Sequence, residues 1–334
     1  MPGVNTSMAL LPVAEVSHAG EPTPLENQPR QPMSLQGLLR FSMEATRAED
    51  TPSNSEFMPM DDERKKFLEE ALKSMTVDVV EILQRQIVLL KGVESLNTSE
   101  GNTKYLEAIE TILEYVDNID IANDFHKIGG FTTIYPCMKS TDSKIRAGGC
   151  ELLAVLCQNN PYCQTVVLDN EFVPKLLYMI ENDDDGQVVT KGIYALGGIV
   201  RDNPEGLTQL IHYNGLSVLL NCLKSNHENV IIKSAFLLGT LCRAAPNLKE
   251  KLTSLGSVPQ LVSLFLTERS ACHEHVMSLL VSILEDNPVA VDQFKNHSPN
   301  MKDLLQRYLS SVNNREECLE EQTYCKRLLH ILQS

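Results

Sequence analysis

The sequence predicts an all-α protein built from repeated helical units and preceded by a tail that we expect to be disordered. Three observations predict this class. A proline recurs at nearly constant intervals, apolar residues stand at helical spacing before each proline, and no proline-free stretch shows the two-residue alternation of a strand. The 334 residues are 43% hydrophobic but only 5% aromatic and contain no Trp. Leu, Ile, Val, Met and Cys must therefore fill the core, which suits helix-on-helix packing.

The interval is the strongest of these observations. Pro161, Pro204, Pro246 and Pro288 lie 43, 42 and 42 residues apart, and an aliphatic residue stands five positions before each: Leu156, Ile199, Leu241 and Ile283. A repeat of about 40–47 residues with two or three helices is typical of armadillo and HEAT proteins. Because proline lacks an amide hydrogen and fixes φ, we expect each one to end a long helix and begin the next.

A second series lies between the prolines. The turn residues Gly130, Glu171, Gly215 and Gly256 are spaced 41, 44 and 41 residues apart, and each precedes a short aliphatic helix. An irregular helical bundle is the alternative, but two interleaved series in register argue against it. We therefore expect an armadillo-like helical repeat solenoid over residues 101–310, with a helical lead-in at 61–100. A capping helix at 311–334 would shield the end of the core.

Residues 1–60 contain half of the 16 prolines and are expected to be flexible, because they cannot bury enough apolar surface to offset the entropy of ordering. One short apolar motif with a single positive charge interrupts this tail at 34–43. Its candidate functional residues are Leu35, Leu38, Leu39, Arg40, Phe41 and Met43.

The charge and the cysteines limit the partners and the compartment. A net charge of −15, from 29 basic and 44 acidic residues, argues against nucleic acid and against an anionic membrane surface. The nine cysteines are odd in number, lack a C-x-x-C pair and mostly fall within apolar helical patterns. They read as buried, reduced thiols of a cytosolic protein. No apolar run approaches the length of a membrane span.

Motifs for catalysis, cofactors and metals are absent, so we expect neither an enzyme nor a cofactor. His273, Glu274 and His275 could suggest a metal site, but helix positions i and i+2 point about 200° apart and Met277 occupies the i+4 position. Contact with a partner is the preferred interpretation. The acidic run 183–185 before Gly186 is interpreted as a loop between repeats rather than as a calcium site.

A stripe of residues offers a different kind of site. Positions 13, 10, 6 and 3 before each proline share one helix face, opposite the aliphatic core positions. In the two central repeats this stripe carries four cations and two aromatic residues: Lys191, Tyr194, Arg201, Lys233, Phe236 and Arg243. Aromatic and arginine side chains commonly anchor protein interfaces. We interpret the stripe as a protein-binding surface, with ordinary solvated positions as the alternative.

The stripe also indicates what kind of protein would bind. Armadillo proteins that bind extended peptides typically carry a ladder of Trp and Asn residues on the corresponding face. Here the matching central positions are Tyr194 and Phe236 in place of Trp, and Gly198 and Thr240 in place of Asn. A folded partner therefore fits better than an extended peptide, and we expect a monomer.

Several stretches in order resemble the armadillo-type nucleotide exchange factors of heat-shock protein 70, in particular the metazoan cytosolic heat-shock-70-binding protein family. The resemblance covers most of residues 34–334. It rests on the sequences Leu35-Gln36-Gly37-Leu38-Leu39 followed by Ser42, Met60 with Glu63-Arg64, Asp117-Asn118-x-x-x-Ala122-x-Asp124-Phe125, Lys233-Ser234-Ala235-Phe236-Leu237-Leu238 and His273-Glu274-His275-Val276. The extreme N-terminus differs from the tails of the family, so nothing is inferred from the resemblance there.

The resemblance implies a co-chaperone that embraces one lobe of the ATPase domain of heat-shock protein 70, promotes ADP release and so releases the client. It also implies that the 34–43 motif helps to eject clients by occupying the peptide groove of the chaperone. The residues expected to contact the ATPase domain are Lys191, Tyr194, Arg201, Lys233, Phe236 and Arg243, with the edge formed by His273, Glu274 and His275. A scaffold for another folded protein, for instance in ubiquitin signalling, remains the alternative, as does an enzyme whose site carries no recognisable motif.

Overall fold

The computed structural model of the chain describes residues 62, 66, 78–95, 102–297, 300–313 and 315–333. The chain divides into two units, Met1–Met75 and Thr76–Ser334. Apart from residues 62 and 66, all of the described residues belong to the second unit. The predicted tail at 1–60 and the motif at 34–43 lie outside them. The described residues form helices joined by short turns, and no strand occurs among them.

The second unit begins with helices that precede the regular repeats. They are α3 (Val79–Leu90), η1 (Val93–Ser95), α4 (Thr103–Val116), α5 (Ile119–Lys127), η2 (Gly130–Thr133) and α6 (Ile134–Met138). On α3, the buried residues Leu83, Ile87 and Leu90 form the face that packs inward.

Three-helix units follow along the chain. Their bounds are α7 (Ser143–Cys157), α8 (Pro161–Asp169), α9 (Phe172–Asn182), α10 (Gly186–Val200), α11 (Pro204–His212), α12 (Gly215–Cys222), α13 (Glu228–Ala244), α14 (Asn247–Ser254), α15 (Ser257–Phe265), α16 (Cys272–Leu284) and α17 (Pro288–His297). The chain continues with α18 (Met301–Val312), η3 (Glu316–Cys318) and α19 (Leu319–Gln333).

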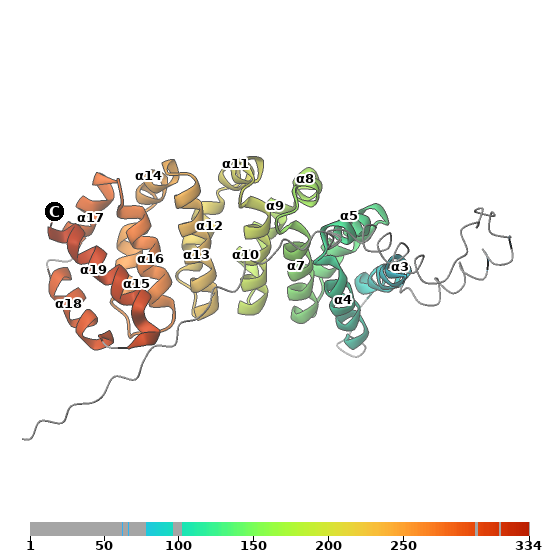
Figure 1. Ribbon diagram of the computed structural model, residues 1–334, viewed down its shortest axis with the longest axis horizontal. Coiled ribbons are helices and arrows are strands. Elements are labelled where there is room, and N and C mark those ends of the chain that lie inside the picture. The colour runs from blue at the N-terminus through green and yellow to red at the C-terminus, as the bar shows by residue number, and fades with distance from the viewer. Residues whose placement is uncertain are drawn as a thin grey trace, which may run out of the picture. The chain divides into compact units, whose positions relative to one another are not determined.

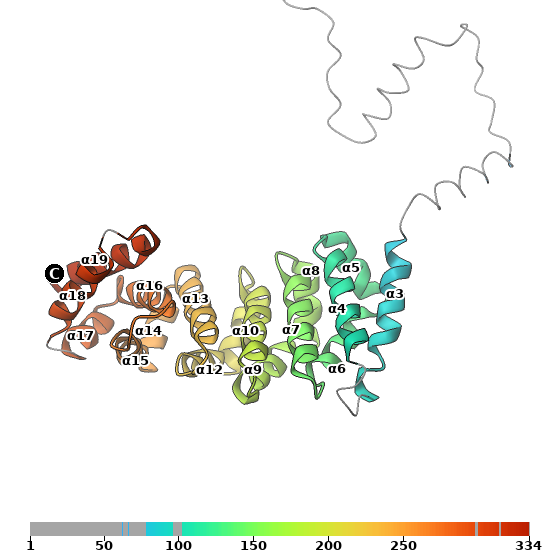
Figure 2. The same ribbon diagram turned by 90° about the horizontal axis from the view of Figure 1, so that it is seen from below.

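Equivalent helices of successive units stack in rows. The helices α4, α7, α10, α13, α16 and α19 pack one against the next, and Figure 2 shows α10, α13 and α16 above α9, α12 and α15. The helices α9, α12 and α15 lie on the opposite side of that view, whereas α8, α11, α14 and α17 follow the top of the array in Figure 1. One apolar core runs through the stack, as expected when no unit can bury its apolar surface alone.

The two repeating series of the sequence have clear structural counterparts. The aliphatic residues five positions before the prolines, Leu156, Ile199, Leu241 and Ile283, are all buried. Pro161, Pro204 and Pro288 are the first residues of α8, α11 and α17, where the missing amide hydrogen costs nothing. The turns of the second series contain residues with positive φ, namely Gly129, Glu171, Asn214 and Gly256.

An asparagine before the proline fixes the corner in three of the four units. The Oδ1 atoms of Asn160, Asn203 and Asn287 accept hydrogen bonds from the backbone N–H groups of Cys163, Gly206 and Ala290 at 3.2, 3.1 and 3.2 Å. Their Nδ2 atoms donate to the preceding unit, to Asn123, Gln164 and Thr253 at 3.0, 3.3 and 3.0 Å. Each asparagine therefore caps a helix and joins two units.

The third corner lacks this asparagine and is built differently. Ala245 occupies the position, and α13 extends to Ala244 while α14 begins one residue after Pro246. The backbone of Ala245 nevertheless has φ −134° and ψ 87°, close to the −129° and 98° of Asn203. The geometry that an asparagine cap requires is therefore present without the side chain.

The variant Ala245→Asn is expected to raise the free energy of unfolding by up to about 1 kcal/mol, because residue 245 already has the φ and ψ of the cap at Asn203 and the new Oδ1 can share the N–H of Leu248, which donates to the carbonyl of residue 245 at 3.0 Å. Conversely, Asn160→Ala should lower it by about 1–2 kcal/mol, since it removes a cap and a buried bond between units. Urea unfolding followed by circular dichroism measures both. Ala244→Asn, at an exposed neighbouring position, is the control; an Ala245→Asn protein no more stable than that control would contradict the prediction.

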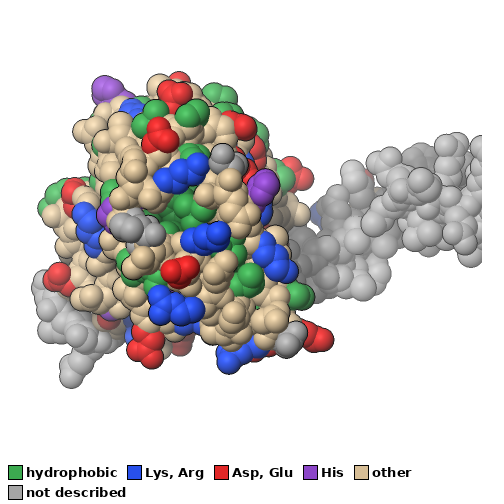
Figure 3. Space-filling view, turned by 90° about the vertical axis from the view of Figure 1, so that its left-hand side faces the viewer, with side chains coloured by type: hydrophobic (Ala, Val, Ile, Leu, Met, Phe, Trp, Pro, Cys, Tyr) green, Lys and Arg blue, Asp and Glu red, His purple; other side chains and the backbone are tan. Residues whose placement is uncertain are grey.

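The C-terminal helices cover the last repeat. Cys318, Cys325 and Leu328 are buried, and the guanidinium of Arg269 forms an ion pair with Glu321 at 2.6 Å. Figure 3 looks onto this end and shows basic, acidic and neutral side chains mixed around small hydrophobic areas. Such a surface suits an end that faces water.

All nine cysteines are free and buried, as the sequence predicted. Burial raises the pKa of the Cys137 thiol to about 12, so that this thiol is unreactive at neutral pH.

Candidate functional site

The stripe predicted from the sequence lies on the row formed by α7, α10, α13 and α16 and is less buried than the opposite, core-facing side of these helices. Its α13 members are the most accessible: Lys233, Phe236 and Arg243 are exposed, Phe236 by 48%. An exposed phenylalanine between two cations is unusual for a surface that binds nothing.

A close approach of two helices explains why one position of the stripe, Gly198, carries no side chain. A Cβ atom added to Gly198 would lie 3.0 Å from the carbonyl oxygen of Ala154. The backbone of α7 therefore occupies the space that a side chain at position 198 of α10 would need. Gly198 is buried accordingly. The position cannot carry the asparagine of a peptide-binding ladder without moving the two helices apart.

Neighbouring helices of the row are linked by polar contacts within the stripe. Lys191 Nζ forms an ion pair with Glu151 Oε1 at 2.5 Å, with the two side chains 27% and 35% exposed. The Tyr194 hydroxyl donates a hydrogen bond to Gln158 Oε1 at 2.9 Å. The sequence placed Lys191 among the cations offered to a partner, whereas its charge is already balanced by an acid of the preceding unit.

Three other cations of the stripe have no carboxylate within ion-pair distance among the described residues. Lys233 Nζ lies 5.8 Å from the centroid of the Tyr194 ring. The Arg201 Nε–H donates to the carbonyl of Gly197 at 3.1 Å, and the Arg243 Nη2–H donates to Thr240 Oγ1 at 3.1 Å. These bonds orient the side chains but leave their positive charges uncompensated.

The structure separates the two histidines of the predicted edge. His273 is only 1% exposed, and its ring stacks on that of Tyr308 with 5.9 Å between centroids. The Nδ1 atom of His273 accepts the backbone N–H of Ser270 at 3.1 Å. The prediction that His273 contacts a partner therefore disagrees with its burial. His275 does lie at the surface of the row, edge-on to Phe236 with centroids 6.5 Å apart.

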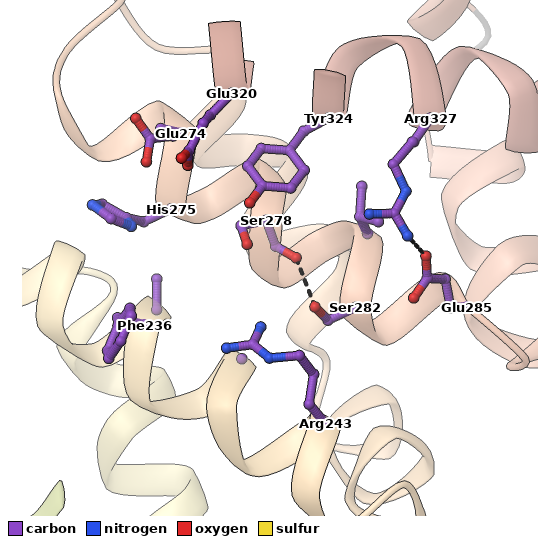
Figure 4. A pocket seen from close by; sticks show the side chains of 13 residues that line it. Phe236, Arg243, Glu274, His275, Ser278, Ser282, Glu285, Glu320, Tyr324 and Arg327 are labelled. Carbon is purple, nitrogen blue, oxygen red and sulfur yellow. Dashed lines mark hydrogen bonds and ion pairs between the residues drawn. The ribbon is translucent and has the colours of Figure 1, made fainter. Parts of the chain in front are cut away.

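A cavity of about 420 Å³ opens at the C-terminal end of the stripe, between α13, α16 and α19 (Figure 4). Phe236 and Arg243 line it from α13, and Glu274 and His275 from α16. The contribution of α19 was not foreseen from the sequence and consists of Glu320, Tyr324 and Arg327. Their spacing of four and three residues places them on one helix face. This spacing is the feature of the sequence that could have predicted a shared surface.

Charges in this cavity are separated. Glu274 and Glu320 extend toward each other at one end, while Arg327 forms an ion pair with Glu285 at the other. Burial, and then a hydrogen bond with Glu320 and its charge, raise the pKa of Glu274 above its ordinary value. Burial lowers the pKa of His275, despite the charge of Glu320. Burial therefore disfavours the charged form of His275.

Among the described residues, no cluster of His, Cys, Asp and Glu is arranged to hold a metal ion. The acidic run 183–185 is the loop between α9 and α10. Asp183 Oδ2 forms an ion pair with Arg146 Nε at 2.7 Å. Asp185 caps α10 by accepting hydrogen bonds from the backbone N–H groups of Gln187 and Val188. No described helix is both long enough and apolar enough to cross a membrane.

Comparison with known proteins assigns the chain to a family. Residues 35–125 match the family model of the nucleotide exchange factor Fes1, and residues 121–234 match that of the SIL1/FES1/HPBP1 C-terminal domain. Hsp70-binding protein 1 of Mus musculus is 29% identical over 322 residues, 93% of this chain and 89% of the relative. The chain belongs to the family of Fes1, SIL1 and Hsp70-binding protein 1.

Other relatives agree with this assignment, and a solved structure agrees with the predicted fold. Hsp70-binding protein 1 of Homo sapiens is 29% identical over 90% of this chain and 85% of its own length. The Hsp70 nucleotide exchange factor FES1 of Mycosarcoma maydis is 26% identical over 46% of this chain and 39% of its own. The designed armadillo repeat protein YIII(Dq)4CqI superimposes with a TM-score of 0.58 at 15% identity, over 75% of this chain and 99% of its own. The armadillo-like fold predicted from the repeat is thereby confirmed.

The facing carboxyl groups predict a pH-dependent gain of stability. Because the folded state raises the pKa of Glu274, its ionised form opposes folding at neutral pH, and Glu274→Gln should raise the melting temperature at pH 7. The gain should shrink as the pH falls through the raised pKa, since the wild-type carboxyl then becomes neutral too. Calorimetry at pH 4 and pH 7 tests this. A variant less stable than wild type at pH 7 would contradict it.

Proposed function

We propose that this chain is a nucleotide exchange factor for a chaperone of the Hsp70 family, and that it binds the ATPase domain and promotes the release of ADP. The family model that matches residues 35–125 is that of a nucleotide exchange factor, and the relatives that align over most of the chain are named Hsp70-binding protein 1. A chain of this kind acts by binding and needs no catalytic group. It would work in the cytosol as a monomer.

The observation that carries the placement of the site is the group of uncompensated cations around an exposed aromatic ring. Lys233, Phe236 and Arg243 stand on one face of α13 in a chain with a net charge of −15. Such a face selects an acidic surface on a folded partner and provides an apolar anchor at its centre. Arg201 and Tyr194 extend the face onto α10.

The stacked row also supplies the rigidity that the function requires. A factor that holds one lobe of a two-lobed domain must resist the closure of that domain around ADP, so its own helices must not yield. The ion pair Lys191–Glu151 and the hydrogen bond Tyr194–Gln158 tie α10 to α7 within the stripe itself. Linkage makes the effect reciprocal, because a factor that weakens ADP binding is itself bound more weakly by the ADP complex, by the same ratio.

Reversal of charge at the centre of the face tests the proposal. Lys233→Glu is expected to weaken binding to the ATPase domain about tenfold, chiefly through slower association, because reversing a charge of the contact face weakens the electrostatic steering of the encounter. Stopped-flow release of labelled ADP and surface-binding kinetics measure the two effects. Lys224→Glu changes the same charge on an exposed lysine beyond α12 and should leave both unchanged. Equal ADP release by wild type and the Lys233 variant would refute the placement.

Reversal of Lys191 requires a different control because Glu151 would face the new acid. The charge-swapped pair Glu151→Lys with Lys191→Glu keeps the internal attraction and moves the positive charge onto α7. Lys191→Glu together with Lys233→Glu should abolish accelerated ADP release while the helical circular-dichroism signal stays intact. If the swapped pair restores stability but not exchange, Lys191 contributes directly to the contact.

The 34–43 motif is proposed to assist client release by entering the peptide groove of the chaperone. Its apolar side chains and its one cation, Arg40, suit a groove that takes extended apolar segments. Deletion of residues 34–43 should leave ADP release unchanged and slow the release of a labelled client peptide. Deletion of residues 14–23, also ten residues of the tail, serves as the control. Normal client release after loss of 34–43 would show that the motif has no such role.

A further inference from the structure

The cavity between α13, α16 and α19 differs from the rest of the stripe in the balance of its charges. Elsewhere on this row, Glu151 is paired with Lys191 and Glu285 with Arg327. Glu274 and Glu320 instead face each other, and no cation lies within ion-pair distance of either among the described residues (Figure 4). Two neighbouring acids without a cation are unfavourable for the isolated chain.

Among the described residues, none of the basic side chains near the cavity forms an ion pair with Glu274 or Glu320. Lys233 lies over the Tyr194 ring at 5.8 Å, and Arg243 donates to Thr240 Oγ1 at 3.1 Å. Arg327 is bound to Glu285. His275, the remaining basic side chain, has its pKa lowered by burial, which disfavours its charged form. The acidic end of the cavity is therefore open to a cation from outside.

The walls of the cavity suit the stem and head of a basic side chain. Phe236 and Tyr324 present aromatic rings from α13 and α19, and Phe236 is half-exposed. Aromatic faces attract guanidinium and ammonium groups, and a pair of carboxylates accepts the planar donors of arginine. A volume of about 420 Å³ is ample for one such side chain.

We infer that this cavity receives a basic side chain, an arginine or lysine, from the surface of the ATPase domain of the chaperone. The inference rests on the proposed function and adds that the contact has opposite charges at its two ends. The partner surface would present acidic groups to Lys233 and a cation one helix further along, to Glu274 and Glu320. Two contacts of opposite sign fix the register of the complex, since a shift along the row by one unit would bring like charges together.

The double variant Glu274→Gln with Glu320→Gln removes both charges and keeps the shapes of the side chains. Its affinity for the nucleotide-free ATPase domain, measured by titration calorimetry on the full chain, should fall at least tenfold. Its melting temperature should not fall, because the substitution relieves repulsion. A loss of affinity without a loss of stability separates a lost contact from partial unfolding.

Glu316→Gln with Glu317→Gln is the matched control, because it removes two exposed acids just before α19 that do not line the cavity. It should bind within twofold of wild type. Tyr324→Leu provides a second test, with an expected loss of about threefold from the missing aromatic face.

Affinity of the Glu274/Glu320 variant equal to that of wild type would overturn the inference and leave the proposed function standing. An equal loss in the control variant would also overturn it, because the effect would then come from net charge alone. A wild-type chain that does not bind the ATPase domain would overturn the proposed function, and the inference with it.

Discussion

The stacking of one helix from each unit into a single row is the constraint on which the other features depend. A three-helix unit of about 42 residues cannot enclose an apolar core alone, so each of these helices must bury one side against the units before and after it. Ala154 and Gly198 show how closely α7 and α10 approach. The residues on the accessible side of these helices form the stripe. Because they are not needed for the core, their side chains can be suited to binding a partner.

The corners between units convert this stacking into a fixed geometry. The Asn-Pro pairs at 160–161, 203–204 and 287–288 end one helix, begin the next and reach back to the preceding unit in the same few atoms. The corner at Ala245 keeps the backbone and lacks the bonds. This corner follows α13, the helix that carries the most exposed part of the stripe. The corner without asparagine hydrogen bonds therefore adjoins the proposed contact.

The charges of the stripe and of the cavity beside it differ in whether they are neutralised. Lys191 and Arg327 neutralise acids of neighbouring helices and so contribute to the row itself. Lys233 and Arg243 are not neutralised and face outward, whereas Glu274 and Glu320 oppose each other. The face thus has a basic centre and an acidic C-terminal end, which gives a partner both a position and a direction along the row.

The sequence by itself determined the repeat, the corners and the identity of the stripe, because spacing along one helix decides which side chains share a face. It therefore located Lys233, Phe236 and Arg243 correctly on an accessible surface. Only the tertiary structure decided that Lys191 is neutralised, that His273 is buried against Tyr308, and that α19 completes a cavity with Glu320 and Tyr324. These outcomes depend on how helices from different units pack against one another, and the spacing of residues within one helix carries no information about its neighbours.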